Sequence, residues 1–173
     1  QDATATDAVA ESEQNAGLEE IVVTAQRRVE SLQRAAVAVT AVTGDDLINS
    51  GITEAANLGR LVPSLVVQPT GGTTSFFLRG VGTNSQNSFA ENAVAFNFNG
   101  IYVGRPTAPA GVFYDLERVE VVKGPQGTLY GRNTLAGAVN MVTRKPSGEF
   151  SGMAQIELGN DNARVSKLSL DLP

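Results

Sequence analysis

Hydrophobic and polar positions divide the chain into four parts with different patterns. Residues 1–18 are mostly Ala, Asp, Glu, Ser and Thr, with few apolar side chains to bury, so we expect a disordered acidic leader. Residues 21–23 are a short β-branched run, Ile-Val-Val, between polar neighbours. This run is either an ordinary edge strand of the domain or a free strand that pairs with another protein's sheet edge through main-chain hydrogen bonds.

The third part, residues 36–148, has the pattern of a small α+β domain. Residues 36–42 predict a strand, and Thr43 with Asp46 three residues later predicts the capped start of a short helix. A second short helix is expected to end at Pro63, because the residue before a proline avoids the α-helical region. Strands and short helices alternate throughout, which favours a small mixed β-sheet with short helices.

A hairpin turn and further strands are predicted in the rest of this domain. Asn99 and Gly100 lie between aromatic and β-branched residues and predict a two-residue turn with positive φ at both positions. Residues 111–116 predict a helical turn. The other expected strands are residues 64–68, 74–81, 117–124 and 136–146.

The last part, residues 149–173, alternates between apolar and polar positions. Gly152, Ala154, Ile156 and Leu158 share one face of the first stretch, and leucines alternate with polar residues after the polar turn. Two stretches of about ten alternating residues around a tight turn are typical of a membrane β-barrel hairpin. A soluble hairpin packed on the domain is the alternative.

Charge is distributed unevenly and gives no sign of a nucleic-acid partner. The formal net charge is −5, and residues 1–20 contain six acids and no base. The rest of the chain has 12 acids and 13 bases, so it is nearly neutral and shows no basic patch of the kind that binds nucleic acid.

The sequence offers no candidate set of catalytic residues. The chain lacks Cys and His, which removes the usual nucleophile–base pairs and the commonest zinc ligands. Glu117 and Glu120 are three residues apart in an expected strand, so they point to opposite faces. The glycine-rich stretch after them matches no phosphate-binding motif, and Pro125 lacks the N–H that a phosphate cradle needs. We therefore expect no enzyme, no cofactor and no metal site.

Several motifs occur in the order found in one family. The most extensive is "ERVEVVKGPQGTLYGRNTLAGAVNMVTRKP", residues 117–146, and "FFLRGVG" and "AFNFNGIYVGRP" precede it. Together with "EEIVVTAQR" at residues 19–27 and the helical segment from Gly44, this series closely resembles the plug domain of TonB-dependent outer-membrane receptors. The resemblance covers residues 19–150, and residues 149–173 are similar to the first barrel strand and the start of the second.

The resemblance implies a gating function. The plug is expected to fill a barrel of about 22 strands, which these residues do not supply. Ligand would bind from outside, and TonB would pull on the plug to open a path for a scarce ligand such as an iron-siderophore complex. Asn99 stands where the family has Asp, which keeps the turn geometry and removes a charge.

Three groups of site residues follow from the resemblance. Residues 19–28 resemble the TonB box region, and Arg79 and Arg132 resemble arginines that pair with acidic groups inside the barrel. The expected TonB-binding residues are Ile21, Val22, Val23, Thr24 and Ala25. The expected structural turns contain Asn99, Gly100, Gly124, Pro125, Gly127 and Gly131.

The resemblance also implies a location and a set of partners. We expect the plug inside its barrel in the outer membrane of a Gram-negative bacterium, with the N-terminus in the periplasm. The partners would be TonB with its inner-membrane motor proteins, the receptor's own β-barrel, and a small ligand such as a metal chelate, cobalamin or an oligosaccharide. The alternative is a stand-alone, barrel-less plug-like protein that binds a ligand or TonB.

Overall fold

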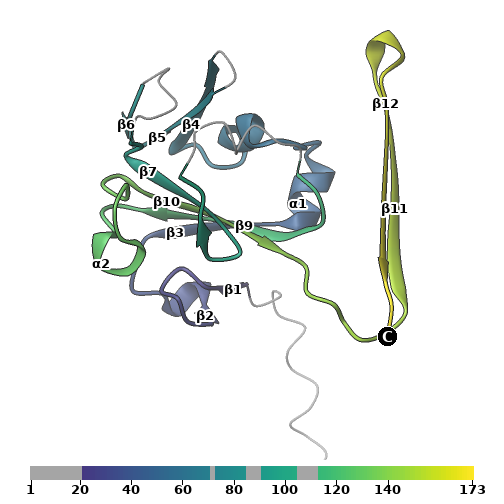
Figure 1. Ribbon diagram of the computed structural model, residues 1–173, viewed down its shortest axis with the longest axis horizontal. Coiled ribbons are helices and arrows are strands. Elements are labelled where there is room, and N and C mark those ends of the chain that lie inside the picture. Colours follow the sequence, from purple (N-terminus) through teal and green to yellow (C-terminus); the bar gives the residue numbers. More distant parts are fainter. Residues whose placement is uncertain (1–20, 71–72, 85–90, 105–112) are drawn as a thin grey trace, which may run out of the picture.

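A five-stranded mixed sheet forms the centre of the computed structural model, which describes residues 21–70, 73–84, 91–104 and 113–173 (Figure 1). Neighbouring strands are antiparallel except β10 and β7, which are parallel. In spatial order the strands are β3 (Val39–Thr43), β9 (Leu116–Lys123), β10 (Gly137–Thr143), β7 (Val94–Phe98) and β8 (Ile101–Tyr102). The fold class predicted from the sequence, a mixed sheet with short helices, is confirmed.

The main hydrophobic core lies on one face of this sheet. Val119 and Val121 of β9 point into it, and Phe96 stacks on Phe76 with ring centroids 5.7 Å apart. This face is covered by two short helices and by a second, antiparallel sheet. The covering elements are α1 (Gly44–Asn49), η2 (Ala55–Arg60), β4 (Leu65–Thr70), β5 (Thr73–Leu78) and β6 (Val81–Gly82).

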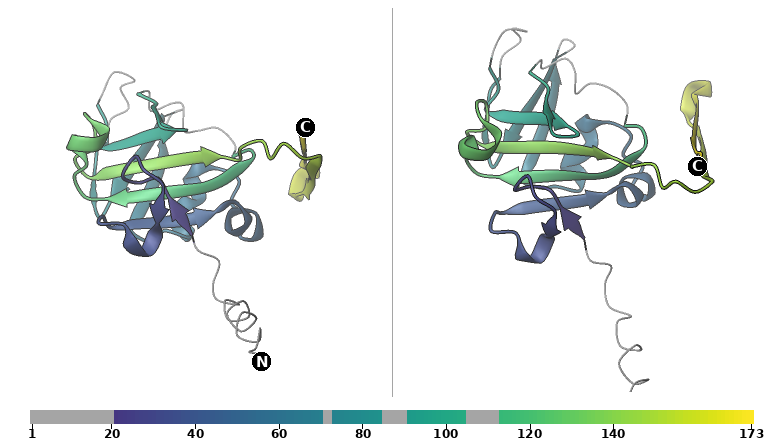
Figure 2. Two further views of the ribbon diagram at one scale, coloured as in Figure 1. Left: turned by 90° about the horizontal axis from the view of Figure 1, so that it is seen from below. Right: turned by 60° about the horizontal axis from the view of Figure 1, so that its bottom comes forward.

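The opposite face of the sheet carries the N-terminal segment (Figure 2). The segment consists of β1 (Val22–Val23) and β2 (Glu30–Ser31), which form a two-stranded antiparallel ribbon, followed by η1 (Leu32–Arg34). Val23 and Ala25 are fully buried against small apolar side chains of the sheet. A small second cluster therefore holds this segment in place.

Local sequence signals explain several boundaries. Thr43 and Asp46 form a reciprocal capping box at the start of α1, as predicted. Asn99 and Gly100 have φ of 49° and 79°, which confirms the turn between β7 and β8. The helical turn predicted for residues 111–116 is wrong where the structure describes it: Phe113 and Tyr114 have no regular secondary structure, Asp115 is a bend with φ of 48°, and β9 begins at Leu116. The Phe113 amide donates to the Thr53 carbonyl at 2.6 Å.

A long hairpin stands beside the rest of the described chain, residues 21–146, which we call the body (Figure 1). It consists of β11 (Ser151–Leu158), the short turn η4 (Asn160–Asn162) and β12 (Arg164–Asp171). Its polar face is joined to the body, because Ser169 Oγ donates to Asp115 Oδ2 at 3.2 Å and the Tyr114 hydroxyl donates to the Leu168 carbonyl. The large apolar side chains of the other face are exposed: Ile156, Leu158, Leu168 and Leu170. Among the described residues, no helix has the length and apolarity needed to cross a membrane.

Candidate functional site

Residues 21–25, the expected TonB-binding segment, are docked on the domain. Val22 and Val23 pair with Ser31 and Glu30, so this run is a short strand within the chain's own fold, and its pairing with another protein's sheet edge stays a prediction. The physical reason for this docking is burial: Val23 and Ala25 both reach the second cluster and are removed from water. The sequence run alone could not show that a partner surface for these side chains exists in the same chain.

The direction of the main-chain N–H and C=O groups in β1 decides which of them remain available for pairing with another strand. The Leu32 amide donates to the Ile21 carbonyl at 2.9 Å, which places the polar groups of Ile21 toward β2. Main-chain groups alternate along an antiparallel strand, so those of Val22 and the amide of Thr24 point away from β2. No described strand pairs with that outer edge.

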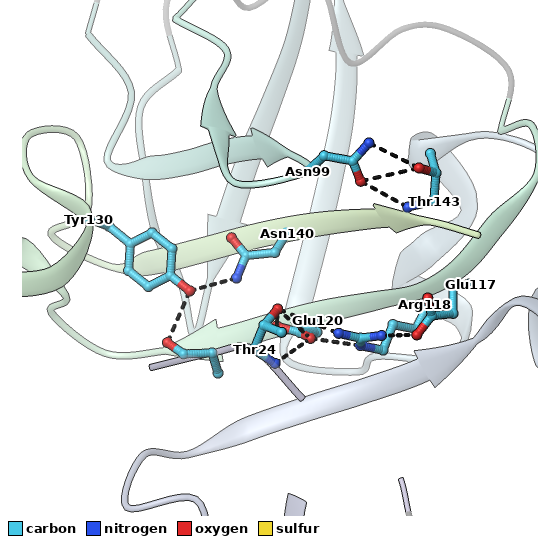
Figure 3. Close-up of polar contacts among 9 residues, drawn as sticks. Thr24, Asn99, Glu117, Arg118, Glu120, Tyr130, Asn140 and Thr143 are labelled. Atoms are coloured by element: carbon cyan, nitrogen blue, oxygen red, sulfur yellow. Dashed lines mark hydrogen bonds and ion pairs between the residues drawn. The ribbon is translucent and has the colours of Figure 1, made fainter. Parts of the chain in front are cut away.

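Glu120 accepts a hydrogen bond from the Thr24 amide, which points away from β2 (Figure 3). The Thr24 amide donates to Glu120 Oε1 at 2.7 Å, and the Thr24 hydroxyl donates to the same oxygen at 3.1 Å. Glu120 is fully buried, and its charge is compensated by Arg118, whose Nε lies 2.8 Å from Oε1. Arg118 also pairs with Glu117 near the surface. A buried carboxylate needs such partners, because an unpaired one costs several kcal/mol.

Tyr130 holds the next residue of the segment. Its hydroxyl donates to the Ala25 carbonyl at 2.9 Å and accepts from Asn140 Nδ2 at 2.8 Å. Burial raises the pKa of the Tyr130 phenol above its ordinary value of 10.0 and the Glu120 charge adds to this, whereas the Asn140 hydrogen bond and Arg27 act in the opposite direction. The phenol therefore stays protonated and remains a donor at physiological pH.

An open groove runs beside the docked segment. It has a volume of about 690 Å³ and lies between Val22 and Thr24 on one side and Asn99, Asn140 and Thr143 on the other. Asn99 bridges to Thr143 at the end of β10, accepting from its amide at 3.0 Å (Figure 3).

The two predicted lock arginines are both at the surface. Arg79 is exposed, has φ of 52° and makes no side-chain hydrogen bond or ion pair with any described residue. Arg132 forms a long ion pair with Glu91 at 3.4 Å, with both side chains at least two-thirds exposed. No described contact joins the two arginines, and each guanidinium can reach a group outside this chain.

The other predicted turn residues, which are Gly124, Pro125, Gly127 and Gly131, follow the end of β9. Gly124 and Gly131 have φ of 94° and 78°, conformations that other residues rarely adopt. Pro125 lies in the connection between them, and Gly127 begins the short helix α2 (Gly127–Tyr130) rather than a turn. Together these residues bring Tyr130 back over the sheet to the N-terminal segment.

Sequence reasoning missed the residues that hold the segment. The expectation that Glu117 and Glu120 lie on opposite faces is wrong: the β9–β10 pairing is irregular at Glu117, and its carboxylate pairs with Arg118, which also holds Glu120. Sequence reasoning did not connect Glu120 with residues 21–25. A signal was present: Arg118 and Glu120 interrupt an apolar strand at alternate positions, so two charges share a face with Val122. Charges at such positions indicate a buried ion pair.

These features define a class. The mixed central sheet, the N-terminal ribbon docked on one face, and the alternating hairpin that follows are those of a β-barrel plug domain. The family model described as "TonB-dependent Receptor Plug Domain" matches residues 31–138, more than half of the chain, and the chain belongs to this family.

Relatives and solved structures agree with this assignment. The iron-regulated outer membrane virulence protein of Vibrio cholerae is 28% identical over 96% of the chain, and the vitamin B12 transporter BtuB of Vibrio vulnificus is 28% identical over 86%. The crystal structure of the ferric yersiniabactin uptake receptor FyuA from Yersinia pestis superposes with a TM-score of 0.72 and 30% identity, covering 79% of this chain and 22% of that one. The chain spans 24% of the length of each of the two curated relatives.

In the described part of the chain, no group of three or more acidic side chains has the arrangement of a metal site.

Proposed function

We propose that this chain is the gating plug of a TonB-dependent outer-membrane transporter. The plug would occlude a β-barrel and open when TonB pulls on residues 21–25. The observation that carries this proposal is the N-terminal segment itself: a short edge strand beside an open groove, with an outer edge that pairs with no described strand. Such a strand can pair with another protein's strand through its main chain.

Force on this segment would reach the centre of the plug directly. The segment is hydrogen-bonded to β9 through Glu120 and to α2 through Tyr130, and β9 pairs with both β3 and β10. Pulling at residues 21–25 therefore loads the two central strands of the sheet first. A rearrangement of these strands would open a path through the barrel.

The hairpin supports a barrel around the plug. Its polar face is turned toward the plug and its exposed face carries Ile156, Leu158, Leu168 and Leu170, as expected of a surface that contacts lipid. In water such a row of apolar side chains would be a liability, which disfavours the stand-alone alternative. Arg79 and Arg132, which are both exposed, would pair with carboxylates of the barrel wall through forked hydrogen bonds.

The location and ligand follow from the same proposal. The barrel would lie in the outer membrane of a Gram-negative bacterium, with residues 21–25 facing the periplasm. The names of the relatives point to an iron chelate or cobalamin as ligand. A transported molecule of this kind is a substrate and not a resident cofactor.

A proline substitution tests the strand-addition step. Val22→Pro removes the outward N–H of β1, so binding of the C-terminal domain of TonB is expected to fall by at least tenfold. Val29→Pro is the matched control, because Val29 is also a valine of the same segment and is exposed but lies outside residues 21–25. Equal binding by the Val22→Pro variant and the unchanged chain, measured by calorimetry, would refute the assignment of residues 21–25.

A further inference from the structure

We propose that the side chains of Asn97 and Asn140 set the register in which β7 and β10 pair, and that they restore this register each time the gate closes. The inference rests on the proposed function, because it concerns how the central sheet re-forms after a rearrangement. It assigns the two asparagines a positioning role in the closed plug.

The β7–β10 pair is parallel, so no tight turn fixes its register. Parallel strands need a long connection, and the chain from β7 to β10 passes through β8, β9 and α2. In the β7–β8 and β11–β12 hairpins, by contrast, the short turn determines which residues lie opposite each other. The parallel pair also joins the β7–β8 hairpin to the other three strands of the sheet. Its register therefore depends on its side chains.

Asn97 and Asn140 lie directly opposite each other in this pair. Asn97 Nδ2 donates to Asn140 Oδ1 at 2.9 Å, and both residues are buried. Asn140 Nδ2 in turn donates to the Tyr130 hydroxyl at 2.8 Å, so both ends of the Asn140 amide are bound (Figure 3). The preceding residues on the same face, Ala95 and Ala138, are small and apolar. The two amides thus form a buried hydrogen-bonded pair beside apolar neighbours.

Other registers would separate this pair. A shift by one residue would turn the side chains of β7 to the opposite face and place Asn97 in the main core. A shift by two residues would place Asn97 opposite Ala138 or Val142, and neither side chain can bond to an amide. A buried amide without a partner makes such a register about tenfold less populated. A single buried asparagine has the same effect on register in coiled coils.

Under the proposed function the register has to be recovered after every opening. Force applied at residues 21–25 reaches β9 through Glu120, and β9 pairs with β10, so a rearrangement can disturb the pairing of β10 with β7. Apolar contacts are not directional and would allow these strands to pair again in a shifted register. A hydrogen bond between two buried amides is directional, and it therefore selects the observed register.

Replacement of both asparagines by valine tests the proposal in the full chain. Exchange of both partners of a buried hydrogen bond for apolar side chains is nearly neutral, so we expect Asn97→Val with Asn140→Val to fold with an unchanged unfolding midpoint. After refolding, NMR is expected to show a second set of amide signals from β7 and β10, because the share of shifted registers rises about tenfold. The unchanged chain is expected to show one set. One set in the double-valine variant would overturn the proposal.

Two further variants make this result specific. Thr143→Val is the matched control: the hydroxyl of Thr143 binds Asn99 between β10 and the β7–β8 turn, but this contact is exposed, and water can replace it. One set of signals is expected. If the double-valine variant does not fold, Asn97→Thr with Asn140→Thr decides, because threonine hydroxyls can bond across strands. One set of signals then supports the proposal, and two sets overturn it.

Uptake of a large hydrophilic antibiotic, vancomycin, tests the closing step in cells that carry the full-length receptor. The double-valine receptor is expected to admit more antibiotic in cells with TonB than in cells without it, because shifted registers accumulate over cycles of opening. Equal entry in both would show a permanent packing defect and overturn the role in closing. Failure of TonB to bind residues 21–25 of the unchanged chain would overturn the proposed function instead, and would leave the NMR result as it is.

Discussion

At the scale of single residues, the account depends on a carboxylate in an apolar strand. Glu120 is buried together with Arg118, and a buried ion pair is stable only while both partners and their hydrogen bonds are present. Its second function is to bind the main chain of a segment almost one hundred positions earlier in the sequence. The residue therefore combines a buried ion pair with a contact that holds the N-terminal strand.

Glu120→Ala should destabilise the domain strongly, because Arg118 loses its buried partner and the Thr24 amide loses its acceptor. We expect the free energy of unfolding to fall by about 3 kcal/mol, measured by denaturant titration. Glu117→Ala, which removes the other, solvent-exposed partner of the same arginine, is expected to cost about 1 kcal/mol or less. Equal losses for the two variants would contradict the assigned burial of the Arg118–Glu120 pair.

Ionisation of the Tyr130 phenol is expected to make the stability of the folded chain depend on pH. Its pKa is higher in the folded chain than the ordinary 10.0, because the buried phenol resists ionisation. The folded state therefore holds its proton more tightly, and the stabilisation is complete below pH 10 and lost as the pH rises through the folded-state pKa. Thermal melts between pH 9 and 11 should show a smaller decline for Tyr130→Phe than for the unchanged chain. Parallel declines would show that this phenol is not involved.

At the scale of elements, substitutions in the β7–β8 turn test the effect of Asn99, which stands where the family motif has aspartate. Asn99 Oδ1 accepts from both the amide and the hydroxyl of Thr143, and an aspartate at this position could accept the same two bonds. Asn99→Asp is therefore expected to change the free energy of unfolding by less than about 0.5 kcal/mol, whereas Asn99→Ala should cost about 1.5 kcal/mol. A large loss in Asn99→Asp, measured by the same titration, would show that the amide donor to Thr143 matters.

Local signals predicted most elements, and long-range packing decided the rest. The capping box at Thr43, the turn at Asn99 and Gly100, and the alternation after residue 149 are set by neighbouring residues, so the sequence was sufficient. The docking of residues 21–25, with the hydrogen bond from Thr24 to Glu120, joins segments 96 positions apart and has no local pattern. The irregular chain at Phe113 likewise makes a long-range contact that no local pattern predicts, the hydrogen bond from its amide to the Thr53 carbonyl.

At the scale of the whole molecule, the two faces of the hairpin differ in polarity. Its strands β11 and β12 carry apolar side chains outward and polar side chains toward the plug, where Ser169 meets Asp115. Under the proposed function the hairpin would face lipid with this apolar side, while the N-terminal segment carries the docked strand. The two features together favour a gate within a barrel over a soluble binding protein.

Charge substitutions on the two faces of β11 distinguish lipid contact from solvent contact. Ile156→Arg places a cation on the exposed apolar face, where a bilayer would oppose it by about 2–4 kcal/mol. In the full-length receptor we expect less folded barrel in the outer membrane, seen as loss of the heat-resistant band on gels. Gln155→Arg, one residue earlier on the polar face, is the control and should assemble normally. Equal assembly of both variants would argue against a lipid-facing hairpin.

The central claim is that TonB pairs with residues 21–25, and a cross-linking measurement tests it most directly. The chain has no native cysteine, so Val22→Cys provides a single thiol for a photoactivated cross-linker, with Val29→Cys as control. Our account predicts a covalent adduct with TonB from position 22 and little or none from position 29. Adducts of equal yield from both positions, or from position 29 alone, would contradict it.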